Sequence, residues 1–398
     1  MGRHRRTKRI TGAALAAATI IGGGVYLNDG SDPASAAVMA SAASCKLPAT
    51  DADLSEGFGS QDGFVPSTGD VKAKMIFVDF PDAPADDTTT SLYDQLAPGA
   101  TSWFSTASYG RLNLSVSADT SRFYRMPDSS DSYGYQRGLS YESHQKYIQD
   151  ALNAVGRSVD FSGTQILYVV PTRRASAISF SPTFMGSVTA ADGTVIDKTV
   201  TLGQDLWYWG SKVINHETGH AMGLPDLYSF ASGDEHRYVG GWDMMGLISG
   251  PDPDRFGWHK WKQHWIDDNQ VRCVTGQGST TVTLTPLETK GGKKIAVVKT
   301  SPTRAVVAEV RTKQGVDSNA CATGVLIYTV DTAIATGNGP IRVQDARPGS
   351  GGCGGHELND ATFGFGANAV THYSDAESGA TIDVTGHSGS KYTLTIRK

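Results

Sequence analysis

The feature that most constrains this chain is the segment 216–226, which reads HETGHAMGLPD. Two histidines four residues apart lie on one face of a helix, about one turn apart, so both imidazoles can bind one metal ion. Gly223 favours a sharp helix end, and Pro225 cannot continue the helix easily because it lacks a backbone N–H. We therefore expect a helix that stops abruptly, after which the chain doubles back and brings Asp226 to the same metal.

This spacing predicts a zinc site with three protein ligands, His216, His220 and Asp226, and one open position. Glu217 follows the first histidine and points to the side of the site, where a bound water would lie. We expect Glu217 to be the catalytic base, which takes a proton from that water and delivers it to the departing amine. A surface helix with coincidental residues and a closed structural zinc site are the alternatives. The second normally needs a fourth Cys or His ligand, and none is nearby.

A methionine-containing segment, GGWDMMGLIS at 240–249, lies shortly downstream. Met245, or else Met244, is expected to supply an apolar floor beneath the metal, although a methionine taken alone more often fills the core. Tyr238 and His236 lie between the two motifs. Either is a candidate for an added oxyanion donor, with a structural role as the more ordinary interpretation.

These motifs resemble the immune inhibitor A family of secreted bacterial metalloproteases, which is similar to the metzincins. HETGHAMGLPDLY resembles the ligand helix of that family, GWDMMG its Met-turn, VKAKMIFVDFPD its first catalytic strand and RFGWHKWKQHWI the helix after the Met-turn. The resemblance implies zinc on His216, His220 and Asp226, catalysis by Glu217 and proteins as substrates. Leu247 stands where some metzincins carry a tyrosine that helps the metal site.

The fold class expected from the patterns is α+β, with a metzincin-like zinc peptidase domain, a mixed β-sheet and an active-site helix, followed by a β-sandwich-like C-terminal domain. Strands are expected over 71–80, 112–117 and 165–170, and helices near 91–106 and 141–156. From about residue 275, short apolar runs separated by Gly, Asp, Ser and Asn turns predict an antiparallel β-sandwich. The expected parts are a signal peptide (1–37), a linker or short propeptide (38–69), the zinc metalloprotease domain (70–273) and the β-rich domain (274–398).

The first 37 residues have the three-part layout of a secretory signal peptide. A basic start, RHRRTKR, precedes an apolar run and then small residues with A-x-A cleavage sites. An uncleaved membrane anchor is the alternative, but the apolar run is short and Gly-rich for a stable span. We therefore expect a secreted, extracellular protein that has no membrane contact after cleavage.

The net charge excludes two classes of binding partner, and the cysteine content predicts disulfides. The net charge is −5, and the strongly basic stretch lies in the leader, which argues against nucleic acid or an anionic membrane as a partner. Four cysteines in an exported chain predict two disulfides. We favour Cys321 with Cys353, which flank one strand-and-loop unit. Cys45 could instead cap the zinc in a zymogen, although the even count favours a disulfide, and Cys273 is the fourth cysteine.

Several further hypotheses stay open on this sequence. The chain is expected to act as a monomer on protein or peptide substrates, but a zinc amidase for cell-wall peptides would use the same chemistry. A secreted binding protein with a relic zinc site is the other alternative, and Glu217 argues against it because an inert scaffold needs no base. Residues 250–254, GPDPD, could bind Ca²⁺, although a solvated turn is the default. Two groups of aromatic residues are expected to pack in the core: Trp207, Tyr208 and Trp209, and Trp258, Trp261 and Trp265. A wall of the substrate cleft is the alternative for the first group.

Overall fold

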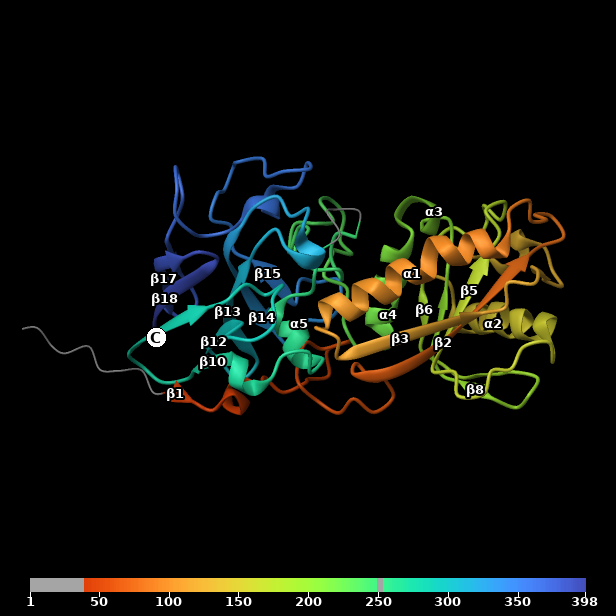
Figure 1. The fold of residues 1–398 in the computed structure, drawn as a ribbon, viewed down its shortest axis with the longest axis horizontal. Helices are drawn as coiled ribbons and strands as arrows, with labels where there is room; N and C mark the ends of the chain where they lie inside the picture. The colour runs from red at the N-terminus through yellow and green to blue at the C-terminus, as the bar shows by residue number, and fades with distance from the viewer. Residues whose placement is uncertain (1–38, 249–252) are drawn as a thin grey trace, which may run out of the picture. The chain divides into compact units, whose positions relative to one another are not determined.

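The computed structural model describes residues 39–248 and 253–398 (Figure 1). The expected signal peptide and residues 249–252 lie outside the described residues. The described chain combines helices with several β-sheets, so the prediction of a mixed α and β fold is confirmed at that level. No helix within the described ranges is long and apolar enough to cross a bilayer.

The first half is built on a sheet with the strand order β3-β2-β5-β9-β6. Its strands are β2 (Gly69–Asp79), β3 (Leu112–Ala118), β5 (Ile166–Pro171), β6 (Thr183–Phe184) and β9 (Thr199–Thr201). Parallel pairing joins β3, β2, β5 and β9, whereas β6 runs antiparallel at the edge. Every residue of β5 is buried, as expected for a central strand covered on both faces. Shorter strands are β4 (Tyr124–Arg125), which pairs with β2, and the hairpin of β7 (Val188–Thr189) and β8 (Val195–Ile196).

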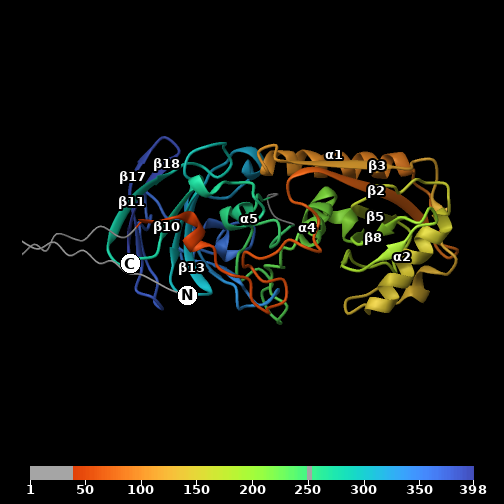
Figure 2. The ribbon, with the colours of Figure 1, turned by 90° about the horizontal axis from the view of Figure 1, so that it is seen from below.

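Helices cover both faces of this sheet (Figure 2). Because side chains alternate along a strand, β2 sends Met75 and Phe77 to one face and Ile76 and Val78 to the other. The first face packs against α1 (Thr89–Ala107) and α4 (Ser211–Ala221), and the second against α2 (Tyr141–Val155). The expected strands and helices of this half are found within two residues of their predicted bounds. The short helix α3 (Leu206–Trp209) directly precedes α4.

The second half contains two further sheets. One has the order β1-β10-β12-β13-β14-β15, with β1 (Met39–Ala40), β10 (Val271–Val274), β12 (Ile295–Lys299), β13 (Arg304–Arg311), β14 (Gly324–Asp331) and β15 (Ile341–Val343). The other has the order β11-β18-β17-β16, with β11 (Ser279–Leu284), β16 (His372–Ser374), β17 (Thr381–Ser388) and β18 (Lys391–Arg397). Apolar residues of both sheets, such as Val306 and Leu394, share one buried core. The named strands from residue 275 onward pair antiparallel with one another, as expected, whereas β10, which lies before that point and is not among the predicted strands, pairs parallel with β12.

Residues 39–58, which we call the N-terminal arm, are part of this second half. Strand β1 pairs with β10, and Cys45 forms a disulfide with Cys273. The indole N–H of Trp258 donates to the backbone oxygen of Glu56 at 3.0 Å. The arm lies inside residues 38–69, which the sequence predicts to be a linker or short propeptide. The expected domain boundary after residue 273 falls within β10. The start of the described chain therefore contributes to the core of its C-terminal half.

The described cysteines form two disulfides, and three tryptophans on and next to a short helix are buried. Cys321 bonds to Cys353, as favoured, and with Cys45 bonded to Cys273 no described cysteine is free to cap a metal. Helix α5 (Gly257–Lys262) carries Trp258 and Trp261, and Trp265 lies just beyond its end. All three indoles are buried, as predicted. Short 3₁₀ turns complete the described fold: η1 (Ala42–Cys45), η2 (Ser130–Tyr133), η3 (Asp268–Gln270), η4 (Gly315–Asp317) and η5 (Glu357–Asp360).

Candidate metal centre

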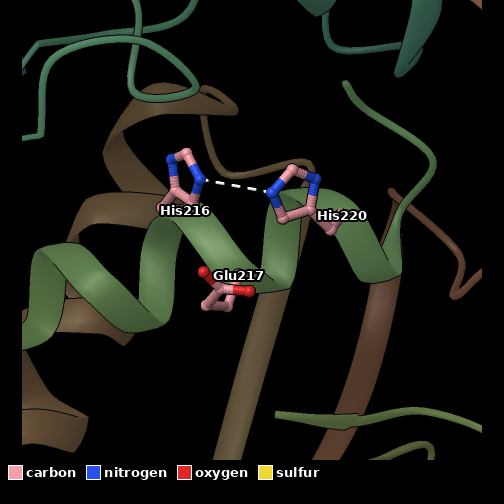
Figure 3. A group of neighbouring side chains, drawn as sticks. All are labelled: His216, Glu217 and His220. Carbon is pink, nitrogen blue, oxygen red and sulfur yellow. Dashed lines mark hydrogen bonds between the residues drawn. The ribbon is translucent and has the colours of Figure 1, made fainter. Parts of the chain in front are cut away.

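Helix α4 presents both predicted imidazole ligands toward one another (Figure 3). The Nε2 atoms of His216 and His220 lie 3.2 Å apart. The helix ends in a Schellman turn, in which Leu224 N–H bonds to Gly219 O at 3.0 Å and Gly223 N–H to His220 O at 2.8 Å. Gly223 has φ +84°, a value that favours glycine, so the sequence explains why the helix stops here.

The carboxylate of Asp226 returns to both imidazoles after this turn. Its Oδ1 atom lies 3.0 Å from His216 Nε2 and 3.1 Å from His220 Nε2. The three atoms form a nearly equilateral triangle, as the spacing of the motif led us to expect. The structure therefore brings together the three residues that the sequence proposes as ligands.

The hydrogen bonds of the two Nδ1 atoms show which ring nitrogen of each histidine carries a proton. His216 Nδ1 lies 2.9 Å from Met244 O, and His220 Nδ1 lies 2.8 Å from Leu224 O. A carbonyl oxygen can only accept, so each Nδ1 carries a proton, and each Nε2 is the nitrogen that is directed into the triangle and can offer a lone pair to a metal ion. Metal-binding histidines in general are held in this way.

These three converging acceptors fit a zinc ion. They need a positive charge among them, because two lone pairs and a carboxylate oxygen repel one another at this separation. A tetrahedral zinc ion with bonds of about 2.0–2.1 Å has ligand atoms about 3.3 Å apart, close to the edges of the triangle. Calcium prefers about six to eight oxygen ligands, so this mixed nitrogen and oxygen set does not suit it.

The electrostatics of the site favour a positive charge. Burial lowers the pKa of His220, but the nearby Asp226 carboxylate outweighs that effect and raises the pKa to about 9. Burial raises the pKa of Asp226, yet the two imidazoles outweigh it and hold this pKa well below its usual range. Either a proton or a metal ion satisfies this preference.

Glu217 lies next to the two histidines and is buried (Figure 3). Its Oε2 atom accepts a hydrogen bond from Thr183 Oγ1 at 2.7 Å, and Thr183 belongs to the edge strand β6. Burial raises the pKa of Glu217, although the imidazoles of His220 and His216 lower it in part. A carboxylate in this setting takes up a proton more readily than a free glutamate does.

Glu217 and Asp226 are both near enough to be considered as the third ligand. One ligand atom each from His216, Glu217 and His220 lies within 4.8 Å of the other two. We favour Asp226 as the ligand because its Oδ1 is within 3.1 Å of both Nε2 atoms, whereas Glu217 Oε2 is held by Thr183. Glu217 is then left for proton transfer.

The turn that contains Met244 and Met245, which we call the methionine turn, packs against α4. A Cβ atom on Gly219 would lie only 2.4 Å from Met245 Sδ, so the two elements approach this closely only because residue 219 is glycine. The backbone of the same turn contributes twice: Met244 O accepts from His216, and Met245 O accepts from Leu227 N–H at 2.9 Å. Met245 thus lies against α4 at Gly219, the residue directly before His220.

A buried chain of charged groups braces this turn, and no motif in the sequence indicates it. Asp243 Oδ1 accepts from Met245 N–H at 2.7 Å, and Asp243 Oδ2 lies 2.9 Å from His259 Nδ1. His259 Nε2 lies 2.9 Å from Glu56 Oε1, on the N-terminal arm. Burial lowers the pKa of His259, but Glu56 and Asp243 outweigh it and raise the pKa to about 9. His259 is therefore an imidazolium at neutral pH and donates to both carboxylates.

A cleft of about 480 Å³ opens over the site. Three large apolar residues in its lining, Met185, Trp209 and Phe230, expose more than a third of their surface. Tyr208, next to Trp209, is 83% exposed. The expected core packing is therefore wrong for Tyr208 and Trp209, and the alternative of a cleft wall holds for Trp209.

The two proposed oxyanion donors lie in different places. His236 lines the cleft, whereas the Tyr238 ring packs against Gly339 and lies under the Arg342 guanidinium at 4.5 Å. The tyrosine that lines the cleft is Tyr228, whose ring centre is 6.0 Å from that of His216. Arg137, another lining residue, hydrogen-bonds to Tyr228. Tyr228 is not among the predicted site residues, and its position two residues after Asp226 is the one signal in the sequence for its place in the cleft.

The suggested calcium stretch gives no calcium site in its described part. Residues 250–252 lie outside the described residues. Asp254 is buried and pairs with Lys260 at 2.5 Å, so a cation of the chain already neutralises this carboxylate. Within residues 39–248 and 253–398, the grouping on α4 is the one with metal-ligand spacing.

No protein-family model matches this sequence, and no curated protein matches it either. Functional inference therefore depends on the geometry of the site.

Proposed function

We propose that this protein is a secreted zinc-dependent endopeptidase with a metzincin-like catalytic half of the immune inhibitor A type and a β-sandwich C-terminal half. The observation that carries the proposal is the convergence of His216, His220 and Asp226, with Glu217 beside them, at the floor of an open cleft. Export is supported by the leader sequence and by the two disulfides.

His216, His220 and Asp226 would hold the zinc ion. When bound, zinc supplies Lewis-acid chemistry: it polarises a carbonyl group and makes a water molecule acidic enough to lose a proton near neutral pH. The Nδ1 bonds of the histidines to Met244 O and Leu224 O fix the ring orientation that this binding requires.

Glu217 carries the proton. It accepts one from the attacking water and delivers it to the nitrogen of the departing amine as the C–N bond breaks. Its raised pKa favours this uptake, and the bond from Thr183 fixes Oε2 so that the carboxylate keeps one orientation. Tyr228, held by Arg137, is the side chain that we assign to help stabilise the negative oxygen of the intermediate.

A peptide is the substrate that the surroundings favour over a small amide. Strand β6 is the last strand of its sheet, and Thr183 on it touches the catalytic base. An extended peptide can add to such an edge through main-chain hydrogen bonds, which place a backbone amide next to Glu217. The exposed apolar side chains Met185, Trp209 and Phe230 offer contacts for its side chains.

Replacement of Glu217 by Gln tests this proposal. We expect hydrolysis of casein to fall by about 100- to 10,000-fold, the range for loss of a general base, while one zinc ion per chain stays bound. Wild-type activity should disappear with a chelator and return with added zinc. Unchanged turnover by the Glu217→Gln variant would refute the mechanism. Turnover of cell-wall fragments but not of casein would favour the amidase, and bound zinc without either activity would favour a binding protein.

A further inference from the structure

The peptide groups on both sides of Asp226 are hydrogen-bonded to the second half of the molecule. Asp226 N–H donates to Thr336 Oγ1 at 2.8 Å, and Gly337 N–H donates to Asp226 O at 3.0 Å. Thr336 and Gly337 belong to the loop between β14 and β15, which we call the ligand-bracing loop (residues 332–340). The proposed third metal ligand is thus held by a loop 110 residues further along the chain.

The contact continues past the ligand. Phe230 N–H donates to Gly337 O at 2.9 Å, so residues 226–230 and the loop are joined at both ends of this segment. Gly337 has φ +70°, and a Cβ atom there would lie 2.2 Å from the Phe230 ring. Glycine at this position therefore allows the loop backbone to reach the ligand segment.

The N-terminal arm holds the loop from the other side. Thr336 N–H donates to Asp53 O at 3.0 Å, and Ser55 Oγ donates to Thr332 O at 2.7 Å. The arm is itself fixed by the disulfide between Cys45 and Cys273. The backbone of Thr336 is thus tied to the arm while its hydroxyl reaches the ligand.

We propose that Thr336 is a positioning residue for Asp226, and that the β-rich half thereby completes the metal site. His216 and His220 project from a regular helix, whereas Asp226 lies outside helix and strand and depends on these bonds for its backbone position. Loss of the hydroxyl leaves the Asp226 N–H without this partner and lets the peptide rotate, which moves the carboxylate away from the two imidazoles. The inference rests on the proposed zinc site, but not on any particular substrate.

The test uses Thr336→Val, which keeps the side-chain shape and removes the hydroxyl. Thr336→Ser keeps the hydroxyl and should restore wild-type behaviour. Thr362→Val is the matched control, because Thr362 is a buried threonine of the same half whose hydroxyl donates to Thr323 O at 3.2 Å. The readouts are the zinc Kd of the metal-free full chain, from chelator competition, and the visible absorption of the Co²⁺ form, which reports ligand geometry.

We expect Thr336→Val to weaken zinc binding by about 10- to 100-fold, the range for loss of a residue that orients a metal ligand. Thr336→Ser and Thr362→Val should stay within about twofold of wild type, and the Co²⁺ spectrum should change only in Thr336→Val. A zinc Kd and spectrum for Thr336→Val that match those of wild type would overturn the proposal. If Thr336→Val does not fold, Thr336→Ala is compared with Thr336→Ser by the same criteria.

The same experiment separates this inference from the proposed function. If the wild-type protein hydrolyses no peptide but its zinc binding depends on Thr336, the proposed endopeptidase activity is refuted and the positioning role of Thr336 is supported. If the protein is an active zinc peptidase and its zinc Kd does not change on replacement of Thr336, the endopeptidase activity is supported and the positioning role is refuted. If the wild-type chain binds no zinc, both the endopeptidase activity and the positioning role are refuted.

Discussion

The ligands of the proposed zinc site come from two regions with different construction. His216 and His220 lie four residues apart on α4, where helical periodicity alone sets their spacing. Asp226 lies in the segment after the helix, and its backbone is fixed by Thr336 and Gly337 from the ligand-bracing loop. The helix provides a pair of ligands from local sequence, whereas the third ligand requires the packing of two distant parts of the chain.

The largest effect should follow from removing a helix ligand. His220→Ala leaves one imidazole and one carboxylate, so we expect zinc to be lost on dialysis and casein hydrolysis to fall to the level of the chelated wild type. Asp226→Asn keeps both imidazoles and should retain weakened zinc binding. Metal analysis after dialysis checks the pair. If Asp226→Asn loses zinc as completely as His220→Ala, the distinction between the two kinds of ligand disappears.

A smaller loss should follow from Thr183→Val, which removes the hydrogen bond to Glu217 Oε2. A hydrogen bond to a charged group contributes about 1.5–3 kcal/mol, which corresponds to a fall of roughly 10- to 100-fold in kcat. Zinc content should not change, because Thr183 contacts the base and none of the three ligands. Steady-state kinetics with zinc analysis provides the measurement. A change in KM alone would show that Thr183 acts on substrate binding instead of on the base.

The buried chain of Asp243, His259 and Glu56 beneath the methionine turn should make the stability of the fold depend on pH. The pKa of His259 is raised from 6.5 to about 9 in the folded protein, so the protonated form is favoured by folding. Its contribution is fully present below about pH 6.5 and is lost as the pH rises through about 9. We expect the free energy of unfolding to drop by on the order of 3 kcal/mol between pH 6.5 and 9.5.

Urea unfolding at the two pH values measures this drop, and His259→Gln is the control. The variant should be less stable than wild type at pH 6.5 and should have a flatter pH dependence. Equal slopes for the two proteins would show that another group is responsible.

The smallest effect concerns the contact between α4 and Met245. Gly219→Ala places a Cβ atom 2.4 Å from Met245 Sδ, which costs about 1–3 kcal/mol in crowding and regains up to about 1 kcal/mol in helix propensity. We expect a net loss of about 1 kcal/mol with a lower zinc affinity. Gly364→Ala is the control, because its Cβ would meet Tyr392 at an ordinary 3.6 Å. Calorimetry that finds Gly219→Ala as stable as Gly364→Ala would contradict the close approach.

The parts of this molecule that local sequence could predict are those set by periodicity and by helix ends. The strand at 71–80, the helices α1 and α2 and the end of α4 at Gly223 all depend on residues that are close in the chain. The pairing of Cys321 with Cys353 was likewise favoured because the two flank one strand-and-loop unit.

The remainder depends on contacts between residues far apart in sequence. Nothing near Thr336 indicates that its hydroxyl binds the peptide of Asp226, and nothing near Glu56 indicates a buried pair with His259. Strand β10 is not among the predicted strands, and a short apolar run does not specify the direction in which a strand such as β10 pairs with β12. The place of Tyr228 in the cleft also depends on how the segment after the helix folds back.

The central claim is that His216, His220 and Asp226 share one zinc ion. X-ray absorption at the zinc edge, on the full chain loaded with one equivalent of zinc, tests it most directly. We predict two imidazole nitrogens and light oxygen ligands at about 2.0–2.1 Å, with the imidazole signal reduced by half in His220→Ala if any zinc remains. Zinc bound without imidazole, or bound equally well after both histidines are replaced, would contradict the claim.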